Sequence, residues 1–251
     1  MRRIKLVVAY DGTDYCGFQV QNNGPTIEGE LNKALSELFG EEIKVIGASR
    51  TDSGVHAYCN VAVFDTNARM PAEKMIYAIN QRLSEDIRVQ SSTEVAGDFH
   101  PRHTESRKTY EYRIYNTGVQ NPMKRRFALW DYHNLDINKM KEAAAYLVGE
   151  HDFKSFCSAD TKVESTVRTI YRLSVEKNGE DIVISVCGNG FLYNMVRIIA
   201  GTLLEVGKGK IEPIAMVEIL KARDRQAAGP TAPAHGLSLV KYEFMESVSN
   251  I

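Results

Sequence analysis

The first 95 residues carry a succession of apolar patterns, and the order of these patterns constrains the fold more than any other feature of the sequence. Strand-like patterns lie at residues 3–10, 43–46, 61–64 and 87–95, and helix-like stripes lie at residues 27–39 and 71–83. Thr26 is a typical N-cap and Gly40 a typical helix end. The order strand, helix, strand, strand, helix, strand is that of the split β-α-β arrangement in a ferredoxin-like half.

The rest of the chain repeats this mixture with insertions. Strands are predicted at residues 107–115, 169–175, 182–186 and 237–244, and helices at residues 136–147, 191–206 and 211–221. Asn178-Gly179 is typical of the tip of a hairpin. Strands and helices that do not strictly alternate indicate an α+β fold. We expect an N-terminal domain over residues 1–104 and a C-terminal domain over residues 105–251.

Composition indicates an ordinary soluble protein. Charged residues make up 25% of the 251 residues and hydrophobic residues 43%, close to globular averages. No stretch approaches the roughly 20 apolar residues that span a bilayer. The first residues enter a strand-like pattern directly, without the pattern of a signal peptide. We therefore expect a cytoplasmic protein without membrane association.

The four cysteines are widely scattered and form no C-x-x-C pair. In a chain of this size they are typical of reduced thiols, so a structural metal is not expected.

Positive charge is concentrated in one part of the chain. The formal net charge is only −1, but between residues 100 and 126 basic residues clearly outnumber acidic ones. This distribution fits either a cationic face for a polyanion or a solvated charged hairpin.

A polar loop between the runs at residues 43–46 and 61–64 is the main candidate for chemistry. Residues 47–57 read Gly-Ala-Ser-Arg-Thr-Asp-Ser-Gly-Val-His-Ala. Asp52 is the only carboxylate of this loop, and Arg50 lies two residues before it. A carboxylate beside a fixed cation stays ionised at neutral pH, as a nucleophile must. The structural alternative is that Thr-Asp-Ser-Gly forms an ordinary turn, in which the Asp caps its own backbone.

Two further segments allow both a structural and a functional interpretation. Tyr110 lies on a predicted strand, where it can pack in the core or stack on an unpaired base while Arg107 and Lys108 contact phosphates. Arg197 lies in an apolar helical run, where it can reach the surface or pair with a carboxylate. A Gly-x-Gly precedes this helix, but the third glycine of a dinucleotide-binding loop is missing.

Taken together, these segments resemble the TruA family of tRNA pseudouridine synthases. The loop at residues 47–57 carries the most specific likeness. Further segments that resemble the family lie at residues 11–19, 99–102, 106–112, 150–156, 188–197 and 228–237. The resemblance implies the pseudouridine synthase fold, with two ferredoxin-like halves joined by a mostly antiparallel sheet and a central basic cleft. It also implies that the loop at residues 228–237 approaches the active site.

The resemblance further implies an activity and the residues that perform it. The family isomerises uridine to pseudouridine in the anticodon stem-loop of tRNA, at uridines 38, 39 and 40. Asp52 would be the nucleophile, Arg197 its ion-pair partner and Tyr110 the side chain that stacks on the uracil. Arg50 would support the extruded nucleotide or fill its vacated place, and His56 would line the loop. The RNA backbone would be contacted by Arg102, Arg107, Lys108, Lys124, Arg125 and Arg126.

The same resemblance implies tRNA as partner, a homodimer, and neither a cofactor nor a metal. Two other functions stay open. A non-catalytic RNA-binding protein on the same scaffold would keep the basic residues without the chemistry. A hydrolase built on His151 and Asp152 would need a nucleophilic Ser or Cys, and no suitably placed one accompanies them.

Overall fold

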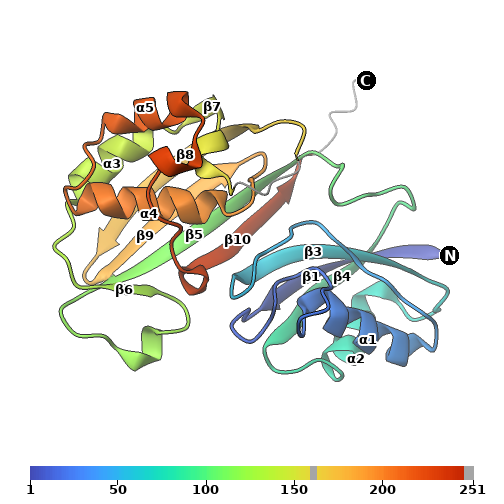
Figure 1. Ribbon diagram of the computed structural model, residues 1–251. Helices are drawn as coiled ribbons and strands as arrows, with labels where there is room; N and C mark the ends of the chain where they lie inside the picture. Colours follow the sequence, from blue (N-terminus) through green and yellow to red (C-terminus); the bar gives the residue numbers. More distant parts are fainter. Residues whose placement is uncertain (159–162, 246–251) are drawn as a thin grey trace. The chain divides into compact units, whose positions relative to one another are not determined.

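The computed structural model describes residues 1–158 and 163–245, and the chain divides into two compact units. Among the described residues, the first unit comprises Met1–Ser106 and residues 239–245, and the second lies within Arg107–Ser238. Figure 1 labels most helices and strands of both units. Within the described residues, no helix is long and apolar enough to cross a membrane.

The first unit is a sheet with two helices. Its elements are β1 (Arg2–Tyr10), α1 (Ile27–Phe39), β2 (Ile46–Gly47), β3 (His56–Thr66), α2 (Met75–Asn80), β4 (Ile87–Val95) and most of β10 (Leu237–Phe244). The strand β1 pairs antiparallel with both β3 and β4, and β2 pairs antiparallel with β3. The predicted order of strands and helices and the split β-α-β arrangement are thereby confirmed.

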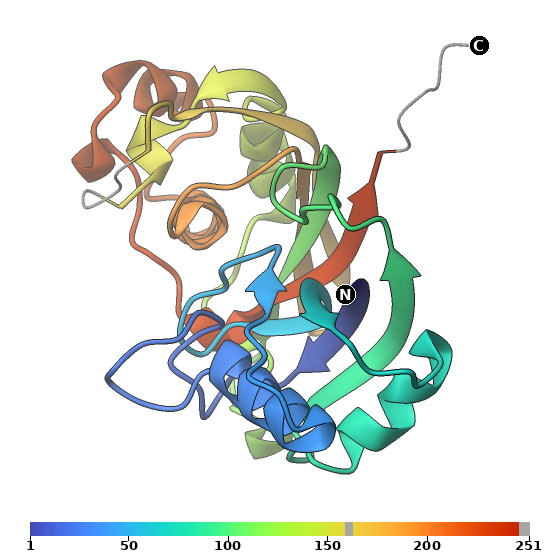
Figure 2. The same cartoon turned by 90° about the vertical axis from the view of Figure 1, so that its right-hand side faces the viewer.

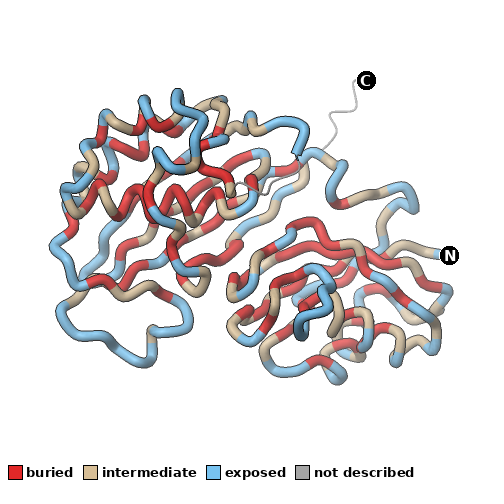
Figure 3. The backbone as a smooth tube through the Cα atoms, in the orientation of Figure 1, coloured by how far each residue is buried: buried red, intermediate tan, exposed pale blue. Residues whose placement is uncertain are grey.

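Helix α1 forms where the sequence predicts it, because both ends are capped. The Thr26 hydroxyl accepts a hydrogen bond from a backbone N–H of the first turn at 3.2 Å, and Gly40 adopts a left-handed φ of 67°. Ile27, Leu31 and Leu35 are fully buried. Figure 3 shows the alternation of buried and exposed residues that this amphipathic pattern produces.

The strand predicted at residues 43–46 is shorter than expected. Only Ile46 of that run, together with the following glycine, pairs as β2. Side chains of α1 bind the backbone before it: Ser36 Oγ accepts from the Ile43 N–H at 2.9 Å, and Asn32 Oδ1 accepts from the Val45 N–H at 2.7 Å. These side chains take the place of a neighbouring strand.

The helix predicted at residues 71–83 is also shorter, for a similar reason. It consists of a 3₁₀ turn, Ala72–Lys74, followed by α2. The Asn80 side chain at the end of α2 donates to the Val89 carbonyl at 2.9 Å and accepts from the Val89 N–H at 2.8 Å. These two hydrogen bonds fix the end of α2 to β4.

The second unit is a sheet covered by helices, as Figures 1 and 2 show. Its strands are β5 (Ser106–Asn116), β6 (Leu129–Asp131), β7 (Gly149–Asp152), β8 (Val167–Asn178) and β9 (Asp181–Gly188). Its helices are α3 (Ile137–Ala145), α4 (Met195–Gly207) and α5 (Ala215–Ala222). The order is β5-β9-β8-β7 with antiparallel pairs, and β6 adds a parallel pair to β5. The predicted α+β class is confirmed.

Several boundaries of this unit differ from prediction, among them the following three. Helix α4 begins at Met195, not at residue 191, because Asn194 has a left-handed φ of 61° that interrupts helical geometry. Helix α5 begins at Ala215, after Pro213. The hairpin turn lies at Gly179 and Glu180, one residue later than predicted, with Gly179 at φ 59° in the first central position as in a type II′ turn.

Short elements without apolar alternation escape sequence prediction. They are the strands β6 and β7 and the 3₁₀ turns Pro122–Lys124, Lys154–Phe156, Arg225–Ala227 and Ala234–Gly236.

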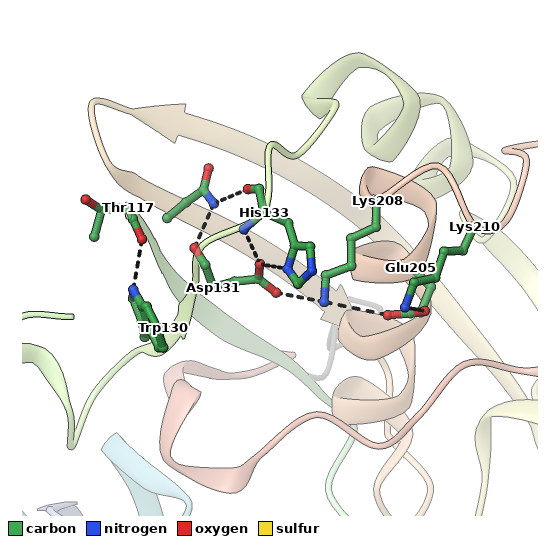
Figure 4. A network of polar contacts seen from close by, with 8 residues as sticks. Thr117, Trp130, Asp131, His133, Glu205, Lys208 and Lys210 are labelled. Atoms are coloured by element: carbon green, nitrogen blue, oxygen red, sulfur yellow. Dashed lines mark hydrogen bonds and ion pairs between the residues drawn. The ribbon is translucent and has the colours of Figure 1, made fainter. Parts of the chain in front are cut away.

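A polar network fixes β6 to the end of α4 (Figure 4). The buried Asp131 carboxylate contacts Lys208 Nζ at 2.8 Å and His133 Nδ1 at 2.7 Å. Burial raises the pKa of Asp131, but the hydrogen bonds from Lys208 and His133 outweigh burial, so the pKa lies below its ordinary value. The carboxylate therefore stays charged and links β6 to Lys208, directly after the end of α4.

Candidate active site

The loop at residues 47–57, called the Asp52 loop below, connects β2 to β3 and contains a tight turn. The Val55 N–H donates to the Asp52 carbonyl at 3.1 Å, and Gly54 takes a φ of 78°, which a type II turn requires at this position. The Ser53 hydroxyl and the Gly54 N–H both donate to the Tyr15 carbonyl, at 3.1 Å and 3.4 Å. The turn chemistry predicted for Thr-Asp-Ser-Gly is therefore present, and it fixes the backbone that carries the half-buried Asp52.

The residue before Asp52 is also held on two sides. The Thr51 carbonyl accepts from the Phe18 N–H at 3.0 Å, and the Thr51 hydroxyl lies 2.7 Å from the hydroxyl of Tyr10. Phe18 itself is almost fully buried. A side chain held by a rigid frame in this way suits a catalytic group, because its geometry does not have to be found in each turnover.

His56 begins β3 and is buried, with an exposed fraction of 2%. Its Nδ1 accepts from the Gly12 N–H at 3.1 Å and lies 3.1 Å from an Asp11 carboxylate oxygen. These contacts anchor the end of the Asp52 loop to the end of β1. The predicted role of His56 in lining the loop toward substrate stays a prediction.

Two cations flank the loop within the first unit. Arg50 is exposed, and Arg102 donates from Nε to the Gly47 carbonyl at 2.7 Å. Burial and, second, the positive charge of Arg50 lower the pKa of Arg102. Because the two positive charges repel each other, the binding of an anion near them, such as a phosphate or the carboxylate of Asp52, is favourable.

In the second unit, Tyr110 lies on β5 opposite Val186 of β9. Its ring has an exposed fraction of 8% and meets the ring of Phe191 edge to face, with centroids 5.3 Å apart and an interplanar angle of 85°. An edge-to-face pair fixes the orientation of both rings. Tyr110 is therefore a well-oriented aromatic side chain, whichever of its two interpretations applies.

Arg107 and Lys108 precede Tyr110 on β5. Their side chains project to opposite faces of the strand, because successive side chains alternate. Lys108 shares the face of Tyr110. Arg107 lies on the other face, where its guanidinium stacks on the ring of Tyr171 at 4.6 Å. Their predicted contacts to RNA phosphates stay predictions.

Arg197 is held on α4 by two oxygen acceptors. Its Nε donates to the Ala232 carbonyl at 2.7 Å, and Nη1 donates to Asn194 Oδ1 at 2.8 Å. The left-handed backbone of Asn194 places its amide next to the guanidinium. The half-buried cation is thus fixed in direction, although neither of these acceptors is charged. The predicted ion pair with Asp52 would join the two units and stays a prediction.

The loop at residues 228–237 supplies one of these acceptors because it packs closely against α4. The Ala232 N–H donates to the Arg197 carbonyl at 3.1 Å. A Cβ added to Gly201 would lie 1.8 Å from the carbonyl oxygen of Pro230. Only glycine allows this approach, so Gly201 determines where the loop can lie relative to Arg197.

We expect Gly201→Ala to destabilise the protein by about 1–3 kcal/mol, because the added methyl overlaps a backbone carbonyl that has no rotamer to move to. Thermal and urea unfolding measure the change. Gly118→Ala in the same unit is the matched control, because its added Cβ meets nothing within 4 Å. Equal stability of the two variants would show that the loop does not need its close packing.

The predicted cluster at Lys124, Arg125 and Arg126 lies between β5 and β6. Lys124 Nζ contacts both Asp181 carboxylate oxygens, at 2.6 Å and 2.7 Å, and lies 4.3 Å from the centre of the Tyr115 ring. It also lines a hollow of about 590 Å³ on this unit. Arg125 and Arg126 are exposed. A surface ion pair contributes only about 0–1 kcal/mol, so a phosphate could displace Asp181 at little cost.

The His151 and Asp152 pair has structural partners. His151 Nε2 lies 3.1 Å from the Val148 carbonyl. Asp152 accepts from the Thr166 hydroxyl at 2.5 Å and pairs with Arg223 Nε at 3.0 Å. These contacts favour the structural interpretation of the pair. The part of the chain that the structure describes contains no group of three or more His, Cys, Asp or Glu side chains that could hold a metal.

The sequence alone did not reveal several residues that orient the candidate functional side chains. Asn194 carries a signal, since Asn before a helix is a typical cap, but its side chain binds Arg197 and makes no cap bond. Ala232 acts through its backbone and leaves no side-chain signal. Asn60 stands out only after the register of β3 is known, because it is a polar residue in a row that faces the core.

Comparison with known sequences decides the family. The family described as tRNA pseudouridine synthase matches residues 6–103 and 143–245. The chain belongs to the tRNA pseudouridine synthase family. It is therefore an isomerase that acts in tRNA pseudouridylation, and the predicted family and fold are confirmed.

Individual relatives match almost from end to end. The tRNA pseudouridine synthase A of Brevibacillus brevis is 50% identical over 239 residues, which cover 95% of this chain and 98% of the relative. The protein of the same name from a Thermoanaerobacter species is 48% identical over 241 residues, covering 96% and 99%. A solved archaeal box H/ACA complex of Nop10 and Cbf5 aligns over 90% of this chain and 60% of its own, with 12% identity and a TM-score of 0.38.

Proposed function

We propose that this enzyme converts uridine to pseudouridine in the anticodon stem-loop of tRNA, at positions 38, 39 and 40, with Asp52 as the nucleophile. The loop that carries Asp52 supports this proposal most: Asp52 is its only carboxylate, and hydrogen bonds fix the backbone of the residues around it. Arg102, whose pKa the positive charge of Arg50 lowers, donates to the Gly47 carbonyl at the start of the same loop. A fixed anion near cations suits both attack on a nucleotide and the approach of a phosphate backbone.

The reaction is an isomerisation. The C1′–N1 bond of uridine breaks, the uracil turns, and C5 bonds to C1′ while the proton at C5 is lost and N1 gains one. No group is gained or lost overall, so the chemistry requires no cofactor. It does require a nucleophile, a site that retains the detached base, and the extrusion of that base from its stack.

Each candidate side chain has a place in this scheme. Asp52 attacks the nucleotide, and Arg197 pairs with its carboxylate and keeps it ionised. Tyr110 stacks on the uracil, and Arg50 supports the extruded nucleotide, with His56 behind the loop. The phosphates are contacted by Arg102, Arg107, Lys108, Lys124, Arg125 and Arg126. The enzyme acts as a cytoplasmic homodimer.

Purified protein and a pool of unmodified tRNA test this function. Mapping pseudouridine at single-nucleotide resolution before and after incubation should show new sites confined to positions 38 to 40. Binding without product would favour an RNA-binding protein on this scaffold, and cleaved tRNA would favour a hydrolase. Pseudouridine only at other positions would contradict the assignment to the anticodon stem-loop.

A further inference from the structure

Asn60 is a polar residue in an apolar row of the first unit. The register of β1 and β3 pairs Ile4 with Phe64, Leu6 with Ala62 and Val8 with Asn60, so Asn60 continues the row that faces the core. It is fully buried. Burying an amide without hydrogen bonds costs about 1–3 kcal/mol on the scale of protein substitutions, so its presence here calls for a role.

The Asn60 side chain makes four hydrogen bonds. Two of them bind Ser49 of the Asp52 loop, and a third binds Tyr10, which in turn contacts Thr51 of that loop. Oδ1 accepts from the Ser49 N–H at 3.2 Å and from the Val61 N–H at 2.9 Å. Nδ2 donates to the Ser49 carbonyl at 3.0 Å and to the Tyr10 hydroxyl at 3.1 Å. The amide therefore holds the backbone of Ser49 by both its donor and its acceptor, as a neighbouring strand would.

Tyr10 continues this chain of bonds to the residue before Asp52. Its hydroxyl accepts from Asn60, so its single proton is free to be donated to Thr51 Oγ1 at 2.7 Å. Burial raises the pKa of Tyr10 far above its ordinary value, so the hydroxyl stays protonated. Asn60 and Tyr10 thus bind residues 49 and 51, which lie three positions and one position before the proposed nucleophile.

A β-bulge brings these groups together. Val8 pairs with Asn60, but Tyr10 pairs with Ala57, so β3 contains one residue more than β1 over this interval. Bulges re-aim side chains and are frequent beside active sites.

We propose that Asn60 and Tyr10 are positioning residues that hold the Asp52 loop in its reactive geometry; this inference rests on the proposed function. Asn60 lies outside the loop at residues 47–57 and touches no reacting atom. It acts through the backbone of Ser49, and Tyr10 acts through the hydroxyl of Thr51. A displacement of about 1 Å in a catalytic group can cost about 100-fold in rate, so loss of this clamp should affect turnover more than tRNA binding.

Tyr10→Phe is the sharpest test, because it removes one hydroxyl and keeps the buried ring. We expect kcat for pseudouridine formation to fall by about 10- to 100-fold, with KM within about threefold of wild type. Asn60→Ala should have the same effect or a larger one. All variants are assayed at a temperature at which circular dichroism shows them folded.

Asn80→Ala provides a matched control for a purely structural role. The Asn80 side chain also donates to and accepts from the backbone of one residue, Val89, at 2.9 Å and 2.8 Å, but it lies at the end of α2. Its loss should lower stability and leave kcat within about twofold of wild type. Hydrogen exchange of a peptide covering residues 49–53 should be faster in Tyr10→Phe than in wild type, and unchanged in Asn80→Ala.

The two hypotheses can fail separately. If wild type forms pseudouridine and Tyr10→Phe keeps both the wild-type kcat and the wild-type exchange rate, the positioning role is overturned and the proposed function stands. If wild-type protein forms no pseudouridine, both are overturned.

Discussion

Asp52→Ala should form no detectable pseudouridine while still binding tRNA within about tenfold of the wild-type affinity. The carboxylate is the only anion of a loop whose backbone is fixed by the turn at residues 52–55 and by the bonds to Thr51. The substitution removes the proposed nucleophile, and the loop contains no second carboxylate to substitute for it. Affinity depends mainly on contacts between basic side chains and phosphates, which the substitution leaves in place.

Steady-state turnover and a tRNA-binding isotherm measured at one stated salt concentration check this result together. Asp98→Asn is a suitable control, because Asp98 is an exposed carboxylate of the same unit outside the loop. We expect wild-type turnover from this control. Product formed by Asp52→Ala at a rate near that of wild type would remove Asp52 as nucleophile.

Arg197→Lys should lower kcat by about 100-fold or more, although the positive charge is kept. The guanidinium donates in two directions at once, to the Ala232 carbonyl and to the Asn194 amide, which sets the direction of its remaining N–H groups. A lysine ammonium has no planar fork and would follow one of these acceptors. Loss of one oriented donor at a reacting centre costs about 100- to 1,000-fold in other enzymes.

Arg223→Lys is the control for this substitution. Arg223 is an exposed arginine of the same unit that pairs with Asp152, so its replacement should change kcat less than about twofold. A single-turnover rate, with enzyme in excess over tRNA, isolates the chemical step from product release. If Arg197→Lys matches wild type in that rate, Arg197 does not orient the reacting groups.

Local chemistry made much of the fold predictable from the sequence. Thr26 and Gly40 cap α1 as their residue types require. The strands β4 and β10 begin and end at the predicted residues, because each carries an uninterrupted pattern between turn signals. Two of the failures in the first unit have a common cause: side chains compete for backbone groups. Ser36 and Asn32 replace a strand partner before β2, and Asn80 ends α2 early. Such contacts depend on tertiary structure, which periodicity does not encode.

In the candidate site, too, local features could be predicted from the sequence, whereas contacts between distant elements could not. The turn that carries Asp52 could be predicted because its loop is compact in sequence and Ser53 and Gly54 act in it as expected, while the role of Asp52 as nucleophile stays a prediction. The residues that orient the candidates were not predictable, because they act from other elements. Asn60 reaches the loop across a bulge, and Ala232 reaches Arg197 through a backbone carbonyl. An amide in a core row is a signal only when the register is known.

A pair of tRNA transcripts tests the central claim most directly. One transcript carries uridine at positions 38, 39 and 40, and the other carries cytidine there and is otherwise identical apart from compensating base pairs. After incubation with the wild-type enzyme, we expect pseudouridine in the first transcript at those positions and none in the second. Equal modification of both transcripts, or of neither, would contradict the account.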